Sequence, residues 1–187
     1  MSIDRKIRDK IQQMAKEDQL VRRQQWRDVQ LLNKRHLDRK NNEYKRVIAG
    51  LIKKLRILDA KHTREMKKIT TRCDWPGRSL VGKRGAAAAW LLVQHADHDL
   101  VFQKKCLILM KSAAPDEVES KHIAYLTDRI LVHEGKEQIY GTQFKSGPDN
   151  NYAPFPIKDP RRLNKLRKEI GLEPFLAYKK RMRALVS

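Results

Sequence analysis

The chain has 187 residues and a formal net charge of +20, with 42 Lys and Arg against 22 Asp and Glu. This length suits one domain with an appendage, and 40% apolar residues are enough for a modest core. The longest apolar run, Ala86 to Val93, is far shorter than the about 20 residues of a membrane-spanning helix, which excludes a membrane span.

The charge is unevenly distributed along the chain. Residues 1–72 hold 22 Lys and Arg against 9 Asp and Glu, residues 73–152 hold 10 against 10, and residues 153–187 hold 10 against 3. Two basic arms therefore flank a neutral centre. Such arms attract polyanions, which makes RNA or DNA a candidate partner, although a merely solvated basic surface explains the composition equally well.

The cysteine content and the N-terminal segment indicate a cytoplasmic protein. Cys73 and Cys106 are the only cysteines, too few for a disulfide framework, so a reducing compartment is expected. The first residues carry charges every few positions and lack the apolar region of a signal peptide.

Residues 1–72 predict a basic helical arm. Ile3, Ile7, Ile11 and Met14 form one stripe at helical spacing, and a second stripe runs over residues 44–58. Two such stripes can pack on each other, so we expect a long helical hairpin here, followed by a core domain over residues 73–187.

The neutral centre begins with further helices. Pro76 and Gly77 indicate a turn. The segment 86–94 is apolar on nearly all sides and predicts a buried helix. Asp99 is a favourable N-cap for a helix over residues 100–112, and another helix is expected from Asp116 to about Thr127.

The pattern then changes to that of strands. Residues 129–144 alternate around a turn at 134–136 and predict a β-hairpin. Asp159 and Pro160 begin a helix that Gly171 ends, and a last helix follows Pro174. The expected fold class is α+β and predominantly helical, with a helical core and one β-hairpin.

Several motifs resemble a bacterial family that is known only as a domain of unknown function. They are "KEDQLVRR" at 16–23, "CDWPGRSLVG" at 73–82, "AAWLLVQHAD" at 88–97, "IAYLTDRILV" at 123–132, "QIYGTQF" at 138–144 and "EIGLEPFLAY" at 169–178. The resemblance implies no established chemistry, but these motifs contain many polar residues. It therefore gives a functional site equal weight with a purely structural network.

The polar motifs predict a pocket that binds or processes a polar or anionic ligand. His95 is the expected general base, with its tautomer fixed by Asp97 or by Asp128, the second expected catalytic residue. Arg129 is expected to hold a carboxylate or phosphate. The full set of expected ligand-binding residues is Gln94, Asp97, Arg129, Gln138, Tyr140, Thr142 and Gln143. In the alternative interpretation, the same residues form a structural hydrogen-bond network.

No cofactor or metal is expected, and the sequence leaves open whether the protein is an enzyme. His95, His98 and Asp99 have ligand-like spacing, but a new helix is expected to begin at Asp99 and would separate them. The oligomeric state is not indicated either.

The alternative function is nucleic-acid binding through the basic arms, with the pocket residues structural. Trp26 lies among the basic residues of the first arm, where it either stacks a base or anchors the helix to its partner helix. The expected contacts are Arg22, Arg23, Arg27, Lys34, Arg35, Arg39, Lys40, Lys179, Lys180, Arg181 and Arg183.

Overall fold

A computed structural model describes residues 3–34, 42–146 and 152–184. It divides the chain into two compact units, Met1–Asp99 and Leu100–Ser187, called here the first and the second unit. The predicted class is confirmed, since helices predominate and the described residues contain one antiparallel β-hairpin. None of the helices in these ranges combines the length and apolar character that a membrane crossing requires.

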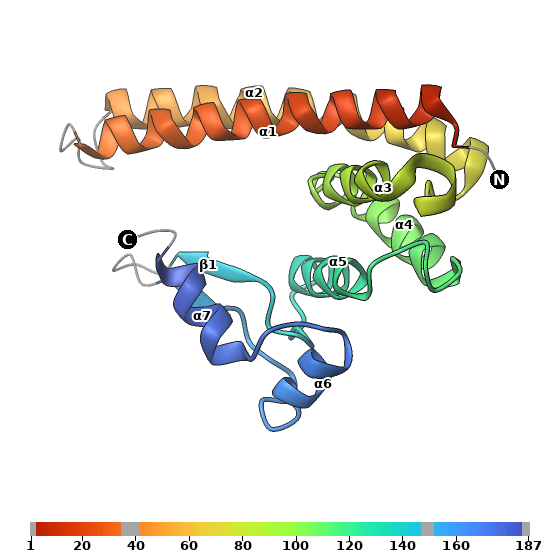
Figure 1. Cartoon of the computed structure of the whole chain (residues 1–187). Helices are drawn as coiled ribbons and strands as arrows, with labels where there is room; N and C mark the ends of the chain where they lie inside the picture. The colour runs from red at the N-terminus through yellow and green to blue at the C-terminus, as the bar shows by residue number, and fades with distance from the viewer. Residues whose placement is uncertain (1–2, 35–41, 147–151, 185–187) are drawn as a thin grey trace. The chain divides into compact units, whose positions relative to one another are not determined.

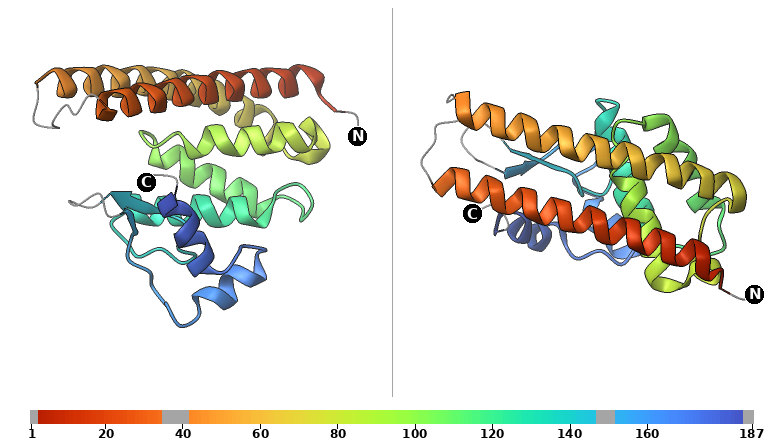
Figure 2. Two further views of the ribbon diagram at one scale, coloured as in Figure 1. Left: turned by 60° about the vertical axis from the view of Figure 1, so that its left-hand side comes forward. Right: turned by 90° about the horizontal axis from the view of Figure 1, so that it is seen from above.

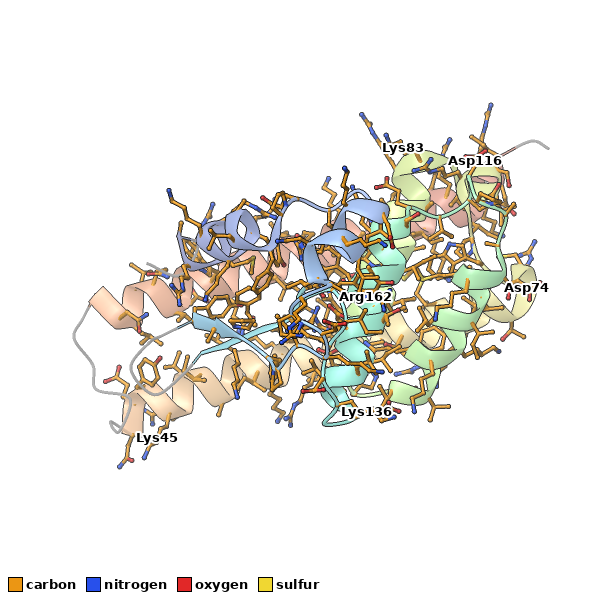
Figure 3. The ribbon with its side chains drawn as sticks, turned by 90° about the horizontal axis from the view of Figure 1, so that it is seen from below. Lys45, Asp74, Lys83, Asp116, Lys136 and Arg162 are labelled. Carbon is orange, nitrogen blue, oxygen red and sulfur yellow. The ribbon has the colours of Figure 1, made fainter. Side chains whose placement is uncertain are left out.

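Three helices build the first unit. They are α1 (Arg5–Lys34), α2 (Asn42–Cys73) and α3 (Arg78–Gln94). Helices α1 and α2 lie side by side as a long hairpin (Figures 1 and 2), which confirms the predicted helical hairpin. In Figure 3, the labelled residues Lys45 and Asp74 mark the two ends of α2.

Apolar and ionic contacts hold the hairpin in an antiparallel register. Ile7, Ile11 and Met14 of the predicted stripe are buried. Across the two helices, residue numbers rise along α1 as they fall along α2 in successive ion pairs. The pairs are Lys10–Glu65, Glu17–Lys61 and Arg22–Asp59.

Helix α3 belongs with the hairpin, although the sequence placed it in a separate core domain over 73–187. It packs on both α1 and α2, because its buried residues, such as Val81, Ala89 and Val93, need an apolar partner surface. The division therefore falls after Asp99. Gly82, with φ +72°, interrupts α3 near its start in a conformation that favours glycine.

The second unit contains the remaining elements. They are α4 (Leu100–Ser112), α5 (Ser120–His133), β1 (Phe144–Ser146), β2 (Tyr152–Pro154), α6 (Leu163–Glu169) and α7 (Phe175–Ala184). Helix α4 has the predicted bounds, and it packs on α5. Asp159 accepts hydrogen bonds from the backbone N–H groups of Arg161 and Arg162 in the turn before α6.

The predicted position of the β-hairpin, residues 129–144, is wrong. Residues 129–133 form the last turn and a half of α5, and β1 instead pairs with β2, Lys145 opposite Ala153. No Gly or Pro interrupts the chain between 120 and 134, so the helix continues until Gly135, where φ is +72°. The strand was predicted from the β-branched Ile130 and Val132, although Ile123, Leu126 and Ile130 follow one another at the helical spacings of three and four.

Candidate active site

A fully buried carboxylate, that of Asp18 on α1, joins all three helices of the first unit. Its side chain is 0% exposed. It accepts hydrogen bonds from Nδ1 of His95 at 3.0 Å and from Nε of Arg22 at 2.9 Å. Nη2 of Arg22 in turn donates to Asp59 on α2 at 2.5 Å. His95 follows α3 directly, so the residues of this Asp18 cluster (Asp18, Arg22, Asp59 and His95) come from three separate segments.

The helical pattern of α1 explains why Asp18 is buried. Asp18 continues the stripe of Ile11 and Met14 by one further turn and so faces the interior. A buried charge is tolerated only when it is paired and hydrogen-bonded. Burial alone would raise the pKa of Asp18, but the hydrogen bond and charge of His95, with the charge of Arg22 and a hydrogen bond from Gln19, lower it below its usual value.

His95 lines a cleft and uses one of its two ring nitrogens within the cluster. The residue is the C-cap of α3, and its side chain is 14% exposed. Because Asp18 accepts at Nδ1, the neutral imidazole carries its proton there and leaves Nε2 as an acceptor. Nε2 has no hydrogen-bond partner among the described residues. This is the arrangement that a general base requires.

The cleft has a volume of about 500 Å³ and combines basic and acidic groups. Its walls are formed by Ile52, Leu55, Arg56, Asp59, His95, Asp97 and His98. Arg56 and His98 are exposed and make no hydrogen bond or ion pair within the described part of the chain. The cleft therefore offers both donors and acceptors to a polar ligand.

The two carboxyl groups of the cluster differ in their electrostatics. Burial raises the pKa of Asp59 above its usual value, and the opposing effect of Arg22 does not cancel the increase. The pKa of Asp18 moves in the other direction. Environments that separate the pKa values of two neighbouring groups in this way are typical of acid–base sites.

In the second unit, Asp128 organises a loop. Its carboxylate is buried and accepts the backbone N–H groups of Ile139 at 2.7 Å, Tyr140 at 3.0 Å and Thr142 at 2.9 Å. The hydroxyl of Thr142 donates to the same carboxylate at 2.9 Å. Burial raises the pKa of Asp128 against the effect of these donors. All of these contacts fix the backbone of residues 139–142.

The glutamines expected to bind a ligand also hold this loop. Gln138 is buried, and its amide donates to the carbonyl groups of Gln143 at 3.1 Å and Phe155 at 2.8 Å. Nη1 of Arg129 donates to Oε1 of Gln143 at 3.4 Å. Tyr140 is half-buried, and Nη1 of the buried Arg167 donates to its carbonyl at 2.6 Å. The segment 138–143 is thus a braced loop, whereas the sequence predicted a strand.

The predicted pocket residues fall on both units. Gln94, His95 and Asp97 belong to the first unit, where His95 and Asp97 share the cleft. The residues of the second unit share the loop at Asp128; they are Asp128, Arg129, Gln138, Tyr140, Thr142 and Gln143. Each group is brought together within its own unit, and the convergence of all of them on one pocket stays a prediction.

The basic residues expected to contact nucleic acid also differ in their surroundings. Arg22 is bound to Asp18 and Asp59, and Arg181 to Glu173. Several others are on described helices: Arg23, Arg27 and Lys34 on α1, and Lys179, Lys180 and Arg183 on α7. Arg35, Arg39 and Lys40 lie outside the described residues.

Sequence reasoning missed Asp18, Arg56 and Asp59. Asp18 could have been found, because it is an acidic residue at a position that continues an apolar stripe, and Arg22 stands one turn beyond it on the same face. No comparable signal marks Arg56 or Asp59, which reach the cleft only because α2 is long and antiparallel to α1. In the described ranges, no group of three or more His, Cys, Asp or Glu side chains is arranged to hold a metal ion.

Comparison with known proteins places the chain in a family. The model of a family of unknown function, DUF6624, matches residues 6–185, so the chain belongs to this family. The match covers nearly the whole chain, including both the Asp18 cluster and the loop at Asp128. No curated protein and no solved structure matches the chain.

Proposed function

We propose that the first unit catalyses a hydrolytic or group-transfer reaction on a polar or anionic substrate, with His95 as the general base. The observation that carries the proposal is the buried Asp18 carboxylate on Nδ1 of His95, a residue that lines the cleft and whose Nε2 has no partner among the described residues. A base oriented by a buried carboxylate is the recurring arrangement of acid–base catalysis.

Each residue of the cluster has a distinct part in this proposal. Nε2 of His95 takes a proton from water or from a substrate hydroxyl as that oxygen attacks. Asp18 stabilises the imidazolium that forms. The imidazolium of His95 then returns this proton to the leaving group, and Asp59 holds Arg22 in place by accepting a hydrogen bond from its Nη2. Arg22 donates a hydrogen bond to each of the two carboxylates. Its positive charge therefore offsets the repulsion between them and fixes their positions.

Arg56 is the candidate for binding the substrate. It lies in the cleft wall and has no ion-pair partner in the described part of α2 or elsewhere in the described chain. A guanidinium in this state binds carboxylate or phosphate oxygens in pairs. Its role is therefore to position an anionic group and not to transfer a proton.

The test is an assay of the purified full chain with p-nitrophenyl acetate, p-nitrophenyl phosphate and bis(p-nitrophenyl) phosphate. His95→Gln is expected to lower kcat by roughly 100- to 10,000-fold. Arg56→Gln is expected to raise KM for the phosphate substrates, whereas Arg64→Gln on the same helix, also exposed, leaves both constants unchanged.

Two results contradict the proposal. The first is turnover that survives unchanged in His95→Gln. The second is the absence of turnover by the wild-type protein on all three substrates.

A further inference from the structure

A largely exposed tryptophan marks a second hollow in the first unit. Trp26 on α1 is 58% exposed. It lines a hollow of about 400 Å³ together with Arg22, Arg23 and Arg27, called here the Trp26 hollow. Within the described ranges, Trp26 makes no hydrogen bond and no ring contact. The face of the Trp26 indole is therefore open to a ligand.

The arginines of the hollow have different roles. The guanidinium of Arg22 is committed to Asp18 and Asp59, so it forms a fixed wall. Arg23 and Arg27 are exposed and have no ion-pair partner in the part of the chain that the structure describes. They stand four residues apart, on one helix face and about 6 Å apart along the axis. The Trp26 hollow thus joins two available cations to an available aromatic face.

We propose that the Trp26 hollow binds single-stranded nucleic acid, with a base stacked on Trp26 and phosphates on Arg23 and Arg27. The proposal stands independently of the chemistry at His95. A single strand fits because its unpaired bases expose the face that an aromatic ring stacks on, whereas a duplex hides that face.

The charge of the whole unit supports the same occupant. Residues 1–99 hold 25 Lys and Arg against 12 Asp and Glu, a net charge of +13. This excess attracts any polyanion, but charge alone does not distinguish nucleic acid from an acidic peptide. The exposed aromatic face favours nucleic acid over an acidic peptide, because stacking requires a planar base.

The test measures binding of a dye-labelled oligothymidylate of about ten nucleotides to the full chain over a series of salt concentrations. Trp26→Ala is expected to weaken binding about 5- to 100-fold, the range for one stacked base at 1.4 kcal/mol per tenfold, with the salt dependence unchanged. Arg23→Gln and Arg27→Gln are each expected to reduce the slope of log affinity against log salt by about 0.7.

Matched variants separate stacking and local charge from general effects. Leu31→Ala removes an apolar side chain of α1 that is also 58% exposed, and it is expected to leave binding unchanged. Lys6→Gln removes one charge from the same helix, about 26 Å from Arg23, and is expected to have a smaller effect on the slope than Arg23→Gln. Trp26→Leu keeps an apolar side chain but is expected to bind as weakly as Trp26→Ala.

Three outcomes overturn the proposal: no binding by the wild-type chain, wild-type affinity in Trp26→Ala, or equally effective competition by polyglutamate of the same charge. Because Trp26, Arg23 and Arg27 are exposed, their variants are expected to fold normally. A circular-dichroism melting curve of each variant verifies this.

Discussion

Replacing Asp128 by Asn tests whether this carboxylate holds the loop of residues 138–143. Asp128 accepts three backbone N–H groups and one hydroxyl. Asn keeps one oxygen and places an amide N–H₂ where the second oxygen was. The N–H group of Thr142, bound to Oδ2 at 2.9 Å, then faces another donor.

The expected loss follows from these contacts. A buried donor left without an acceptor costs about 1–3 kcal/mol, and the remaining bonds lose the charge of the acceptor. We therefore expect Asp128→Asn to lower the free energy of unfolding by about 3–5 kcal/mol, a large share of the about 5–15 kcal/mol that stabilises a typical protein.

Urea unfolding followed by circular dichroism measures this difference. Asp116→Asn is the matched control, because Asp116 is exposed and such a change is expected to stay within about 0.5 kcal/mol. A loss below about 1 kcal/mol for Asp128→Asn would refute the structural role of the carboxylate and would restore it as a candidate catalytic group.

Three further predictions concern single positions. Asp18→Asn is expected to lower the free energy of unfolding by about 2–4 kcal/mol near pH 7. Because folding lowers the pKa of Asp18, the ionised carboxylate stabilises the fold above about pH 4, and this stabilisation is lost in acid. The unfolding curves of the wild type and the variant should therefore converge as the pH falls. Gly141→Ala is expected to cost about 1–3 kcal/mol, because φ is +65° and a Cβ would lie 2.8 Å from the ring of Phe175; wild-type stability would contradict this. Gly50→Ala, at an exposed site of α2 with no atom within 4 Å, should raise the melting temperature through about 0.5–1 kcal/mol of stabilisation, and a decrease would count against the α2 assignment.

The helices were the part of the fold that the sequence predicted best. Ile7, Ile11 and Met14 repeat at helical spacing because one face of α1 is buried and the other is in water. The bounds of α4 were predicted because Asp99 and Pro115 stand near its two ends. Where one face of a helix is buried, local pattern and tertiary structure agree.

The prediction of a β-hairpin over residues 129–144 was wrong. Ile123, Leu126 and Ile130 of α5 follow at helical spacing, but the β-branched side chains within residues 129–133 and the turn at Gly135 suggested a strand. Within the described residues, the hairpin consists of β1 and β2, each three residues long. Elements this short carry too few residues for a period of two to be recognised.

The candidate site was predicted in part. His95 was singled out because a polar group follows an apolar helix, and the structure places it on the cleft. Its carboxylate partner lies 77 positions earlier in the chain, a separation that no local pattern reveals. The loop residues around Asp128 were recognised as a polar group, but sequence alone does not separate a network that braces backbone from one that binds a ligand.

The tautomer of His95 tests the central claim most directly. Long-range proton–nitrogen NMR correlations of the labelled full chain, recorded in alkaline buffer, identify the ring nitrogen that carries the proton. Assignment uses His95→Gln, and the exposed His98 serves as the internal reference. The account predicts a proton on Nδ1 of His95 in the wild type and a shift toward Nε2 in Asp18→Asn. A proton on Nε2 in the wild type would contradict it.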